Sequence, residues 1–118
     1  MLVVEDDPGI RALLLAVLGL RGHAVHEVER GDEALDAVRA IRPDVISLDL
    51  GLPGLDGMSV LRELKSDRDL QDIPVVVVTA WDDPARISEA SSLGAADYVC
   101  KPFDADALVA RIEAAIGA

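Results

Sequence analysis

Reactive side chains follow four of the apolar runs in this sequence, and their types indicate what they could do together. Glu5 and Asp6 come after "LVV", Asp49 ends "VISLD", Thr79 ends "VVVVT", and Lys101 follows "DYVC". Three carboxylates held close together raise one another's pKa unless a cation lies among them. Oxygen ligands of this kind suit Mg²⁺ better than Zn²⁺, for which the sequence has no Cys/His cluster. These residue types predict a magnesium site if the fold brings them together.

A site of this composition also suits phosphoryl transfer to a carboxylate. Asp49 ends a buried run and leads directly into Gly-Leu-Pro-Gly, a turn sequence, so a metal and a reacting group can reach its side chain. Carboxylates are one class of nucleophile that forms acyl phosphates. The metal and the Lys101 ammonium would neutralise charge on the phosphoryl oxygens, which accounts for much of the catalysis in such transfers. Thr79 would donate a hydrogen bond to one of those oxygens.

The segments that carry these residues alternate between short apolar runs and longer stretches with helical spacing. We expect strands at residues 2–5, 24–28, 44–49, 75–79 and 97–101. We expect a helix that begins at Pro8 and is closed by Gly22, and others over 33–41, 57–66, 84–94 and 104–117, the second introduced by Gly31 and Asp32. The run 24–28 alternates between apolar and polar residues, as an edge strand would.

This alternation predicts the α/β fold class, with one doubly wound (βα)5 domain of the flavodoxin-like type over residues 1–118. Its parallel sheet, in the order 2-1-3-4-5, would have helices on both faces and right-handed crossovers. The carboxyl ends of parallel strands share one edge of a sheet, and ligands bind there near the switch in strand order. We therefore expect Glu5, Asp6, Asp49, Thr79 and Lys101 to converge at that edge.

Composition and charge argue against several functions. The chain has 118 residues and a net charge of −11, which opposes binding to nucleic acid or to a membrane surface. No stretch approaches the roughly 18 to 20 apolar residues of a membrane span, and no signal peptide precedes the first strand. The single Cys100 cannot form an internal disulfide, so the expected location is a reducing cytoplasm. Neither G-x-G-x-x-G nor G-x-x-x-x-G-K-[ST] occurs, which disfavours a nucleotide-binding domain.

The sequence resembles the receiver domain of two-component response regulators over nearly its whole length. The matching residues are Glu5-Asp6 in "VVEDDP", Asp49 in "SLDLGLPGLDG", Thr79-Ala80 in "VVVVTA", and Tyr98 with Lys101-Pro102 in "YVCKPF". Each motif is weak alone, but the whole set in order and with family-like spacing is specific. The resemblance implies a CheY-like fold and a signalling switch in which Asp49 accepts a phosphoryl group. The donor would be a sensor histidine kinase or a histidine phosphotransfer protein.

The resemblance also implies roles for individual residues. Asp6 would bind Mg²⁺ directly, Glu5 would assist through water, and Asp49 and the backbone carbonyl of Gly51 would supply further ligands. Thr79 would move toward the phosphoryl group while Tyr98 turns inward. The surface that changes would comprise the fourth helix, the fifth strand and the fifth helix, which also offers a face for a homodimer. The bond between Lys101 and Pro102 is expected to be cis.

Other functions fit the sequence less well. An Mg²⁺-dependent hydrolase of the haloacid-dehalogenase type has a second Asp two residues after its nucleophile, where this chain has Gly51. A receiver-like interaction module that is no longer phosphorylated would not need the reactive residues that this chain retains. The expected activity is self-phosphorylation and slow hydrolysis, not metabolic turnover. Either a stand-alone receiver or a piece of a larger regulator is expected, with no output domain in the sequence.

Some residues that could bind or react are assigned other roles. Asp7 precedes Pro8 and is expected to cap a helix. His23 and His26 have no clustered partner in the sequence and are expected at the surface. Cys100 is expected to be a small core residue. Trp81, the only tryptophan, is expected to lie over the site as a partial lid that slows attack by water.

Overall fold

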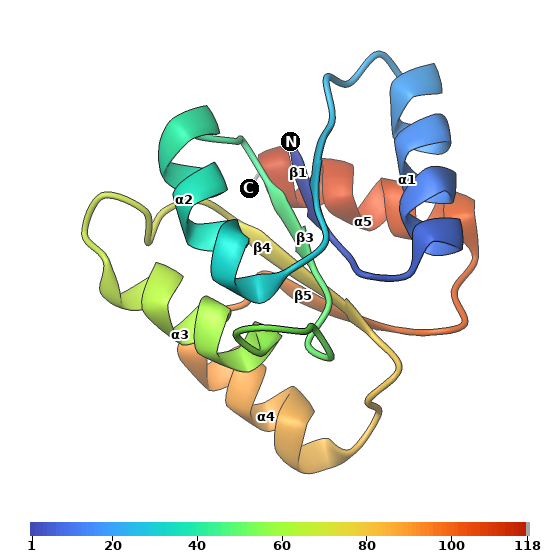
Figure 1. Ribbon diagram of the computed structural model, residues 1–118. Coiled ribbons are helices and arrows are strands. Elements are labelled where there is room, and N and C mark those ends of the chain that lie inside the picture. The colour runs from blue at the N-terminus through green and yellow to red at the C-terminus, as the bar shows by residue number, and fades with distance from the viewer. Residues whose placement is uncertain (118) are drawn as a thin grey trace.

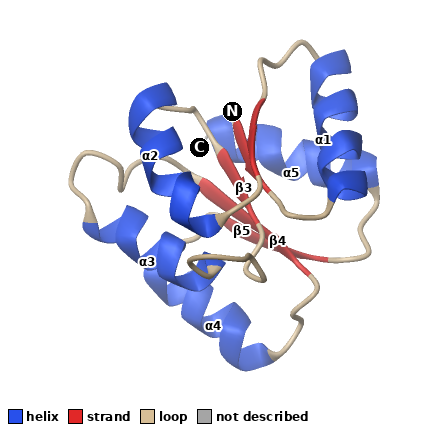
Figure 2. Ribbon diagram, viewed as in Figure 1, coloured by secondary structure: helices blue, strands red, loops and turns tan. Residues whose placement is uncertain are grey.

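Five strands and five helices alternate along residues 1–117, the part of the chain that the computed structural model describes (Figures 1 and 2). In chain order they are β1 (Leu2–Val4), α1 (Pro8–Leu20), β2 (His26–Val28), α2 (Gly31–Ile41), β3 (Ile46–Leu48), α3 (Gly57–Ser66), β4 (Val75–Thr79), α4 (Pro84–Leu93), β5 (Asp97–Cys100) and α5 (Ala105–Gly117). The sheet has the order β2-β1-β3-β4-β5, and all neighbouring strands are parallel. The predicted α/β class and strand order are confirmed.

The sheet separates two layers of helices. Figure 1 shows α1 and α5 on one side and α2, α3 and α4 on the other. Alternate side chains of a strand point to opposite faces, so Val75 and Val77 of β4 pack in one core and Val76 and Val78 in the other. Both cores consist mainly of Val, Leu, Ile and Ala, as a chain with 3% aromatic residues requires. The edge strand β2 is partly exposed, in agreement with its mixed sequence.

The strand register brings the reactive residues to one edge. β1 and β3 end in the same row of the sheet, so Glu5 and Asp49, which follow them, occupy adjacent positions. β4 and β5 extend further, and Thr79 ends β4 opposite Cys100. Lys101 follows Cys100 and therefore lies at the same edge.

Four of the five strands described are shorter than predicted, and β4 has the predicted bounds. The predicted strands 2–5, 44–49 and 97–101 each included the reactive residue at the end, whereas β1, β3 and β5 stop just before it. Glu5, Asp49 and Lys101 still donate backbone N–H bonds to a neighbouring strand. The ladder stops there because the chain turns away at once into the loops that form the edge. The edge strand β2 is shortened at its start, since it begins at His26 and not at residue 24.

Aspartate side chains begin four of the helices. Each accepts a hydrogen bond from a first-turn N–H that would otherwise have no partner; these residues are Asp7 for α1, Asp56 for α3, Asp83 for α4 and Asp104 for α5. The predicted capping role of Asp7 is confirmed. α2 has no side-chain cap and begins at Gly31, earlier than residue 33. Among residues 1–117, no helix is long and apolar enough to cross a membrane.

Candidate functional site

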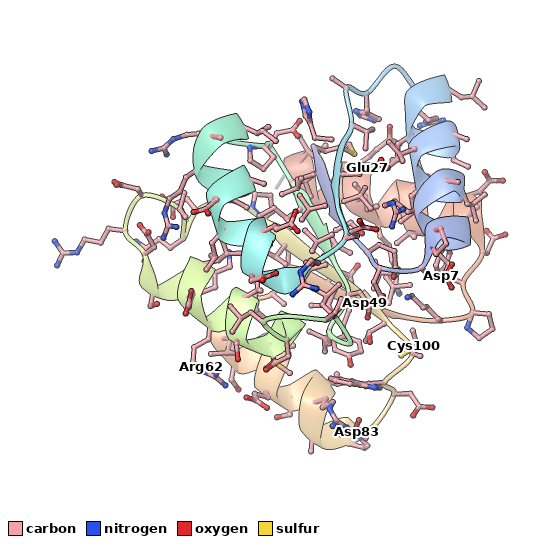
Figure 3. All side chains as sticks on the ribbon, in the orientation of Figure 1. Asp7, Glu27, Asp49, Arg62, Asp83 and Cys100 are labelled. Carbon is pink, nitrogen blue, oxygen red and sulfur yellow. The ribbon has the colours of Figure 1, made fainter. Side chains whose placement is uncertain are left out.

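Three carboxylates from neighbouring strands meet at the carboxyl edge of the sheet. Glu5 and Asp6 follow β1, Asp49 follows β3, and one carboxylate oxygen of each lies within 4.8 Å of those of the other two. Glu5 and Asp49 are buried, with exposed fractions of 2% and 7%, whereas Asp6 is exposed. Figure 3 labels Asp49 at the end of β3, in the middle of this edge. The structure therefore brings the predicted acidic residues together.

Lys101 enters the same site from the end of β5. Its Nζ lies 2.7 Å from Glu5 Oε1 and 3.0 Å from Asp49 Oδ2. The other oxygen of Asp49, Oδ1, accepts a hydrogen bond from the Gly51 N–H at 3.1 Å. Asp49 is thus held by a cation on one oxygen and by a backbone amide on the other. The structure thus has Lys101 beside the acidic residues, where the sequence predicted it.

The charged groups of the site have shifted pKa values. Burial and the nearby Asp49 raise the pKa of Glu5 to about 7, although Lys101 opposes the shift. Burial also disfavours the ionised form of Asp49, but hydrogen bonds from Lys101, Glu5 and Gly51 outweigh it and hold the pKa of Asp49 below its usual value. Burial opposes the charge of Lys101 too, but its two carboxylate contacts outweigh burial and raise its pKa. Near pH 7, Asp49 is therefore ionised and Glu5 is close to half-protonated.

Arg11 supports the turn that carries the acidic pair. Its Nη1 donates to the backbone carbonyl of Glu5 at 3.0 Å. The same guanidinium lies 3.4 Å from Glu27 and 3.5 Å from Glu29, so it ties the end of β1 to β2. Asp7 faces the first turn of α1 and not the acidic group, as Figure 3 also shows. The sequence signal for this support is that Arg11 is the only charged residue of α1.

Two glycines hold the β3–α3 loop (residues 49–56) against its neighbours. A Cβ on Gly31 would lie 1.5 Å from the carbonyl oxygen of Leu55, and a Cβ on Gly57 would lie 2.1 Å from that of Asp49. Any other residue at either position would displace backbone. The Gly31 N–H also donates to the carbonyl of Pro53 at 3.0 Å. From the sequence, Gly31 was predicted only to introduce a helix. Its contact with Leu55 could not be predicted, because the two residues are far apart in the sequence.

Thr79 and Tyr98, the two predicted switch residues, are connected through the backbone of Trp81. Thr79 is buried at the end of β4, and its Oγ1 accepts a hydrogen bond from the Trp81 N–H at 3.4 Å. The Tyr98 hydroxyl donates to the Trp81 carbonyl at 2.5 Å. Burial raises the pKa of Tyr98. A movement of either switch side chain would therefore change a contact of Trp81.

The remaining predictions for single residues have mixed outcomes. His26 is exposed, as predicted, but His23 is half-buried and its Nε2 lies 2.9 Å from Glu113 of α5. The sequence does not reveal this contact, because it depends on how the distant helix α5 packs. Cys100 is partly exposed and not a core residue, since it ends an edge strand. The Lys101–Pro102 bond is cis, as predicted.

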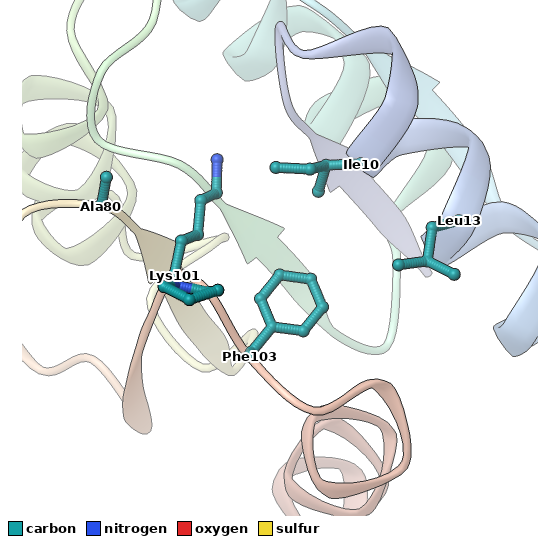
Figure 4. Close-up of a pocket in the computed structure, with 6 residues that line it drawn as sticks. Ile10, Leu13, Ala80, Lys101 and Phe103 are labelled. Carbon is teal, nitrogen blue, oxygen red and sulfur yellow. The ribbon is translucent and has the colours of Figure 1, made fainter.

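An apolar pocket opens beside the acidic site. It has a volume of about 430 Å³ and lies between the start of α1 and the segment after β5. In Figure 4, Ile10 and Phe103 face each other across it, and the Lys101 side chain forms part of its wall. Lys101 therefore separates an apolar surface from the charged group around Asp49.

Fold and site together define a flavodoxin-like α/β protein with an acidic group, a lysine and a threonine at the carboxyl edge of its sheet. The chain belongs to the response regulator receiver domain family, whose model matches residues 1–113.

Individual relatives agree with this assignment. The DNA-binding response regulator MtrA of Mycolicibacterium smegmatis is 42% identical over 97% of this chain and 49% of its own length. The chain thus spans about half the length of the curated relatives it matches. The BeF3-activated N-terminal receiver domain of Klebsiella pneumoniae RstA has a TM-score of 0.89 and 33% identity, covering 98% of this chain and 96% of that one. The Mn²⁺-bound response regulator Rcp1 has a TM-score of 0.83 and 30% identity, with coverage of 98% and 88%.

Proposed function

We propose that this chain is a phosphorylation-controlled switch of a two-component phosphorelay, in which Asp49 accepts the phosphoryl group. The observation that carries the proposal is the pairing of a buried, ionised Asp49 with Lys101 at 3.0 Å inside a group of three carboxylates. The BeF3-activated relative offers a precedent, because this fold in that protein takes up a fluoride complex. Residues 1–118 are proposed to form the receiver unit.

The donor set fits Mg²⁺. The carboxylates of Glu5, Asp6 and Asp49 and the carbonyl of Gly51 are hard oxygen ligands, and Lys101 supplies only one positive charge against three carboxylates. Mn²⁺ in the related Rcp1 is a divalent ion with similar ligand preferences. Bound Mg²⁺ would neutralise charge on the phosphoryl oxygens. The Gly51 N–H already bonds to Asp49, which fixes the loop that carries this carbonyl.

Asp49 is prepared to act as the nucleophile. Its lowered pKa keeps it ionised, and its contacts with Lys101 and the Gly51 N–H orient the carboxylate. In the transfer, an Asp49 oxygen forms a bond to phosphorus while the P–N bond of a phosphohistidine breaks. The imidazole leaves with the electron pair of that bond and takes up a proton from solvent. Lys101 stabilises the negative charge on the phosphoryl oxygens.

The switch would act through Thr79, Tyr98 and the surface formed by α4, β5 and α5. Phosphorylation of Asp49 adds negative charge and hydrogen-bond acceptors at the edge of the sheet where β4 also ends. The Thr79 hydroxyl, which now accepts a hydrogen bond from the Trp81 N–H, would then move to donate to a phosphoryl oxygen. Tyr98 would repack against the changed loop. The phosphoryl group shifts the equilibrium between two conformations because it interacts better with one of them. A homodimer through this face is part of the proposal.

The proposed partners follow from the family to which the chain belongs. The donor is proposed to be a sensor histidine kinase or a histidine phosphotransfer protein. The net charge of −11 disfavours contact between this domain and nucleic acid, so any DNA binding, as in the relative MtrA, is assigned to residues outside it. The activity is self-phosphorylation and slow hydrolysis, not turnover of a metabolite.

The test uses acetyl phosphate with Mg²⁺ and detection by intact mass. We expect one added phosphoryl group, which is lost in Asp49→Ala and in the presence of a chelator. Labelling that persists in Asp49→Ala would show that the acceptor is another residue. Sustained hydrolysis of p-nitrophenyl phosphate by the domain would instead favour a hydrolase.

A further inference from the structure

The indole of Trp81 borders the space in front of Asp49. Its ring atom Cζ2 lies 3.7 Å from the point that a Cβ on Gly51 would occupy, and Asp49 Oδ1 lies 4.0 Å from the same point. Gly51 has no side chain, so it leaves this volume unfilled next to the proposed phosphoacceptor. Trp81 is therefore the side chain that closes this flank of the site.

Arg86, in the first turn of α4, stacks on the Trp81 ring. Its guanidinium carbon lies 4.1 Å from the centre of the Trp81 ring system. Asp83 accepts hydrogen bonds from Arg86 Nη1 at 2.9 Å and from the Arg86 backbone N–H at 3.3 Å. Asp83, labelled at the start of α4 in Figure 3, thus caps the helix and orients the guanidinium. Nearly half of each side chain is exposed, so the ion pair itself contributes little to stability.

We infer that Arg86 is a positioning residue that sets the lifetime of the phosphoryl group on Asp49 by holding the Trp81 indole beside it. The inference rests on the proposed phosphorylation of Asp49. It names a structural cause for the lifetime of the phosphorylated state. The contacts from Asp83 to Arg86 and from Arg86 to Trp81 link the start of α4 to the reacting group. Because the same Trp81 backbone bonds to Thr79 and Tyr98, the ring and the switch are coupled.

The reaction that this arrangement slows is hydrolysis of the acyl phosphate. The oxygen of a water molecule forms a bond to phosphorus, and the bond between phosphorus and the Asp49 oxygen breaks. Asp49 keeps the electron pair as a carboxylate, and inorganic phosphate leaves while a proton passes to solvent. An apolar ring fixed beside Gly51 occupies volume from which water would otherwise approach. A ring without its Arg86 contact leaves that volume open for part of the time.

The experiment compares Arg86→Gln and Arg86→Lys with a matched control, Arg62→Gln. Arg62 is similarly exposed and pairs with Glu89 of α4 at 2.9 Å, but it belongs to α3 and has no stacking contact with Trp81. Figure 3 labels Arg62 on that helix. Acrylamide quenching of the emission of Trp81, the only tryptophan, measures how firmly the ring is held. The loss of phosphate after removal of acetyl phosphate, followed by intact mass, gives the lifetime.

We expect Arg86→Gln to raise both the quenching constant and the hydrolysis rate by about two- to fivefold, the factor that an exposed cation–π contact can supply. Arg86→Lys keeps the cation and should restore most of the lifetime. Arg62→Gln should change neither quantity. In a Trp81→Leu background, Arg86→Gln should have no further effect on the rate, because Arg86 acts through the ring.

Three results would overturn the inference. One is a hydrolysis rate in Arg86→Gln equal to that of the wild type. Another is the same acceleration by Arg86→Gln in the Trp81→Leu background, which would mean that the charge of Arg86 acts directly. The third is a wild-type protein that takes up no phosphoryl group at all, and this result alone would also remove the proposed function.

Discussion

At the residue scale, the fold shifts the pKa values of two similar acids in opposite directions. Glu5 and Asp49 are both buried and share Lys101, yet the pKa of Glu5 is raised to about 7 and that of Asp49 is lowered. Burial is the largest cause at both residues, and each accepts one backbone N–H, from Asp7 at Glu5 and from Gly51 at Asp49. The difference arises because the contact between the two acids raises the pKa of Glu5 and lowers that of Asp49. Asp49, the proposed acceptor, thus stays ionised, while Glu5 binds a proton and so reduces the repulsion between the two carboxylates.

This difference predicts how the stability of the metal-free protein depends on pH. The pKa of Glu5 is about 7 in the folded state and 4.5 in its ordinary state, so the folded protein binds this proton more tightly. The contribution of Glu5 to stability should therefore rise as the pH falls through about 7, and it is complete below the unfolded value. Each tenfold difference in proton affinity is worth about 1.4 kcal/mol, so the gain is on the order of a few kcal/mol. Urea unfolding at a series of pH values, with chelator present, measures it.

Glu5→Gln is the matched control for this pH dependence. Glutamine has nearly the same shape but cannot bind the proton, and every other titrating group is common to both proteins. The difference in unfolding free energy between wild type and variant should therefore change between about pH 8 and pH 5. A constant difference across this range would mean that the pKa of Glu5 is not raised.

At the scale of elements, α2 supports the loop that carries the acceptor. Gly31→Ala should destabilise the protein by about 1–3 kcal/mol, because its Cβ would meet the Leu55 carbonyl at 1.5 Å and the loop must move. It should also slow phosphorylation by acetyl phosphate, since Gly51 lies on that loop. Chemical denaturation and the labelling rate give the two quantities.

Gly19→Ala provides the comparison for that substitution. Gly19 lies within α1, and a Cβ there would meet nothing within 4 Å. The exchange should stabilise the protein by up to about 1 kcal/mol and leave the labelling rate unchanged. Equal effects of the two alanines would show that the contact between Gly31 and Leu55 is not needed.

The cap of α3 gives a second prediction for an element. Asp56 accepts hydrogen bonds from the N–H and the hydroxyl of Ser59, both at 3.0 Å, and these contacts lower its pKa. Asp56→Ala should therefore lower the unfolding free energy by about 1 kcal/mol at pH 7. An acid with a lowered pKa loses this contribution as the pH falls through its folded value, so wild type and variant should converge in acid. Ser59→Ala keeps the N–H bond and should have the smaller effect.

The sequence predicted those elements and site residues that depend on local pattern. The β-branched run at 75–79 and the apolar stripe at 57–66 matched β4 and α3 in their bounds. The position of Glu5, Asp49 and Lys101 followed from topology alone, because parallel strands end at one edge. The contacts of Gly31 with Leu55, Arg86 with Trp81 and His23 with Glu113 were not predictable. They depend on loop paths and side-chain rotamers that are fixed only when distant elements pack.

At the scale of the whole molecule, the site joins the two layers of the fold. Its residues end β4 or follow β1, β3 and β5, and the side chains of these strands pack in both cores. A ligand that holds these strand ends together therefore acts on the entire sheet and not on one loop. Binding to the folded state alone stabilises a protein by an amount set by the ligand concentration relative to its dissociation constant.

Mg²⁺ should therefore stabilise the whole fold against heat and urea. At about 100 times the dissociation constant, the expected gain in unfolding free energy is about 2.7 kcal/mol. Because a net charge of −11 makes any salt somewhat stabilising, NaCl at equal ionic strength is the control. Asp6→Asn tests the site itself: Asp6 is exposed, so the variant should fold, but it lacks a proposed ligand and should lose most of the Mg²⁺-specific gain. If Mg²⁺ stabilised Asp6→Asn as strongly as the wild type, the ion would be acting on the general acidic surface and not at the end of β1.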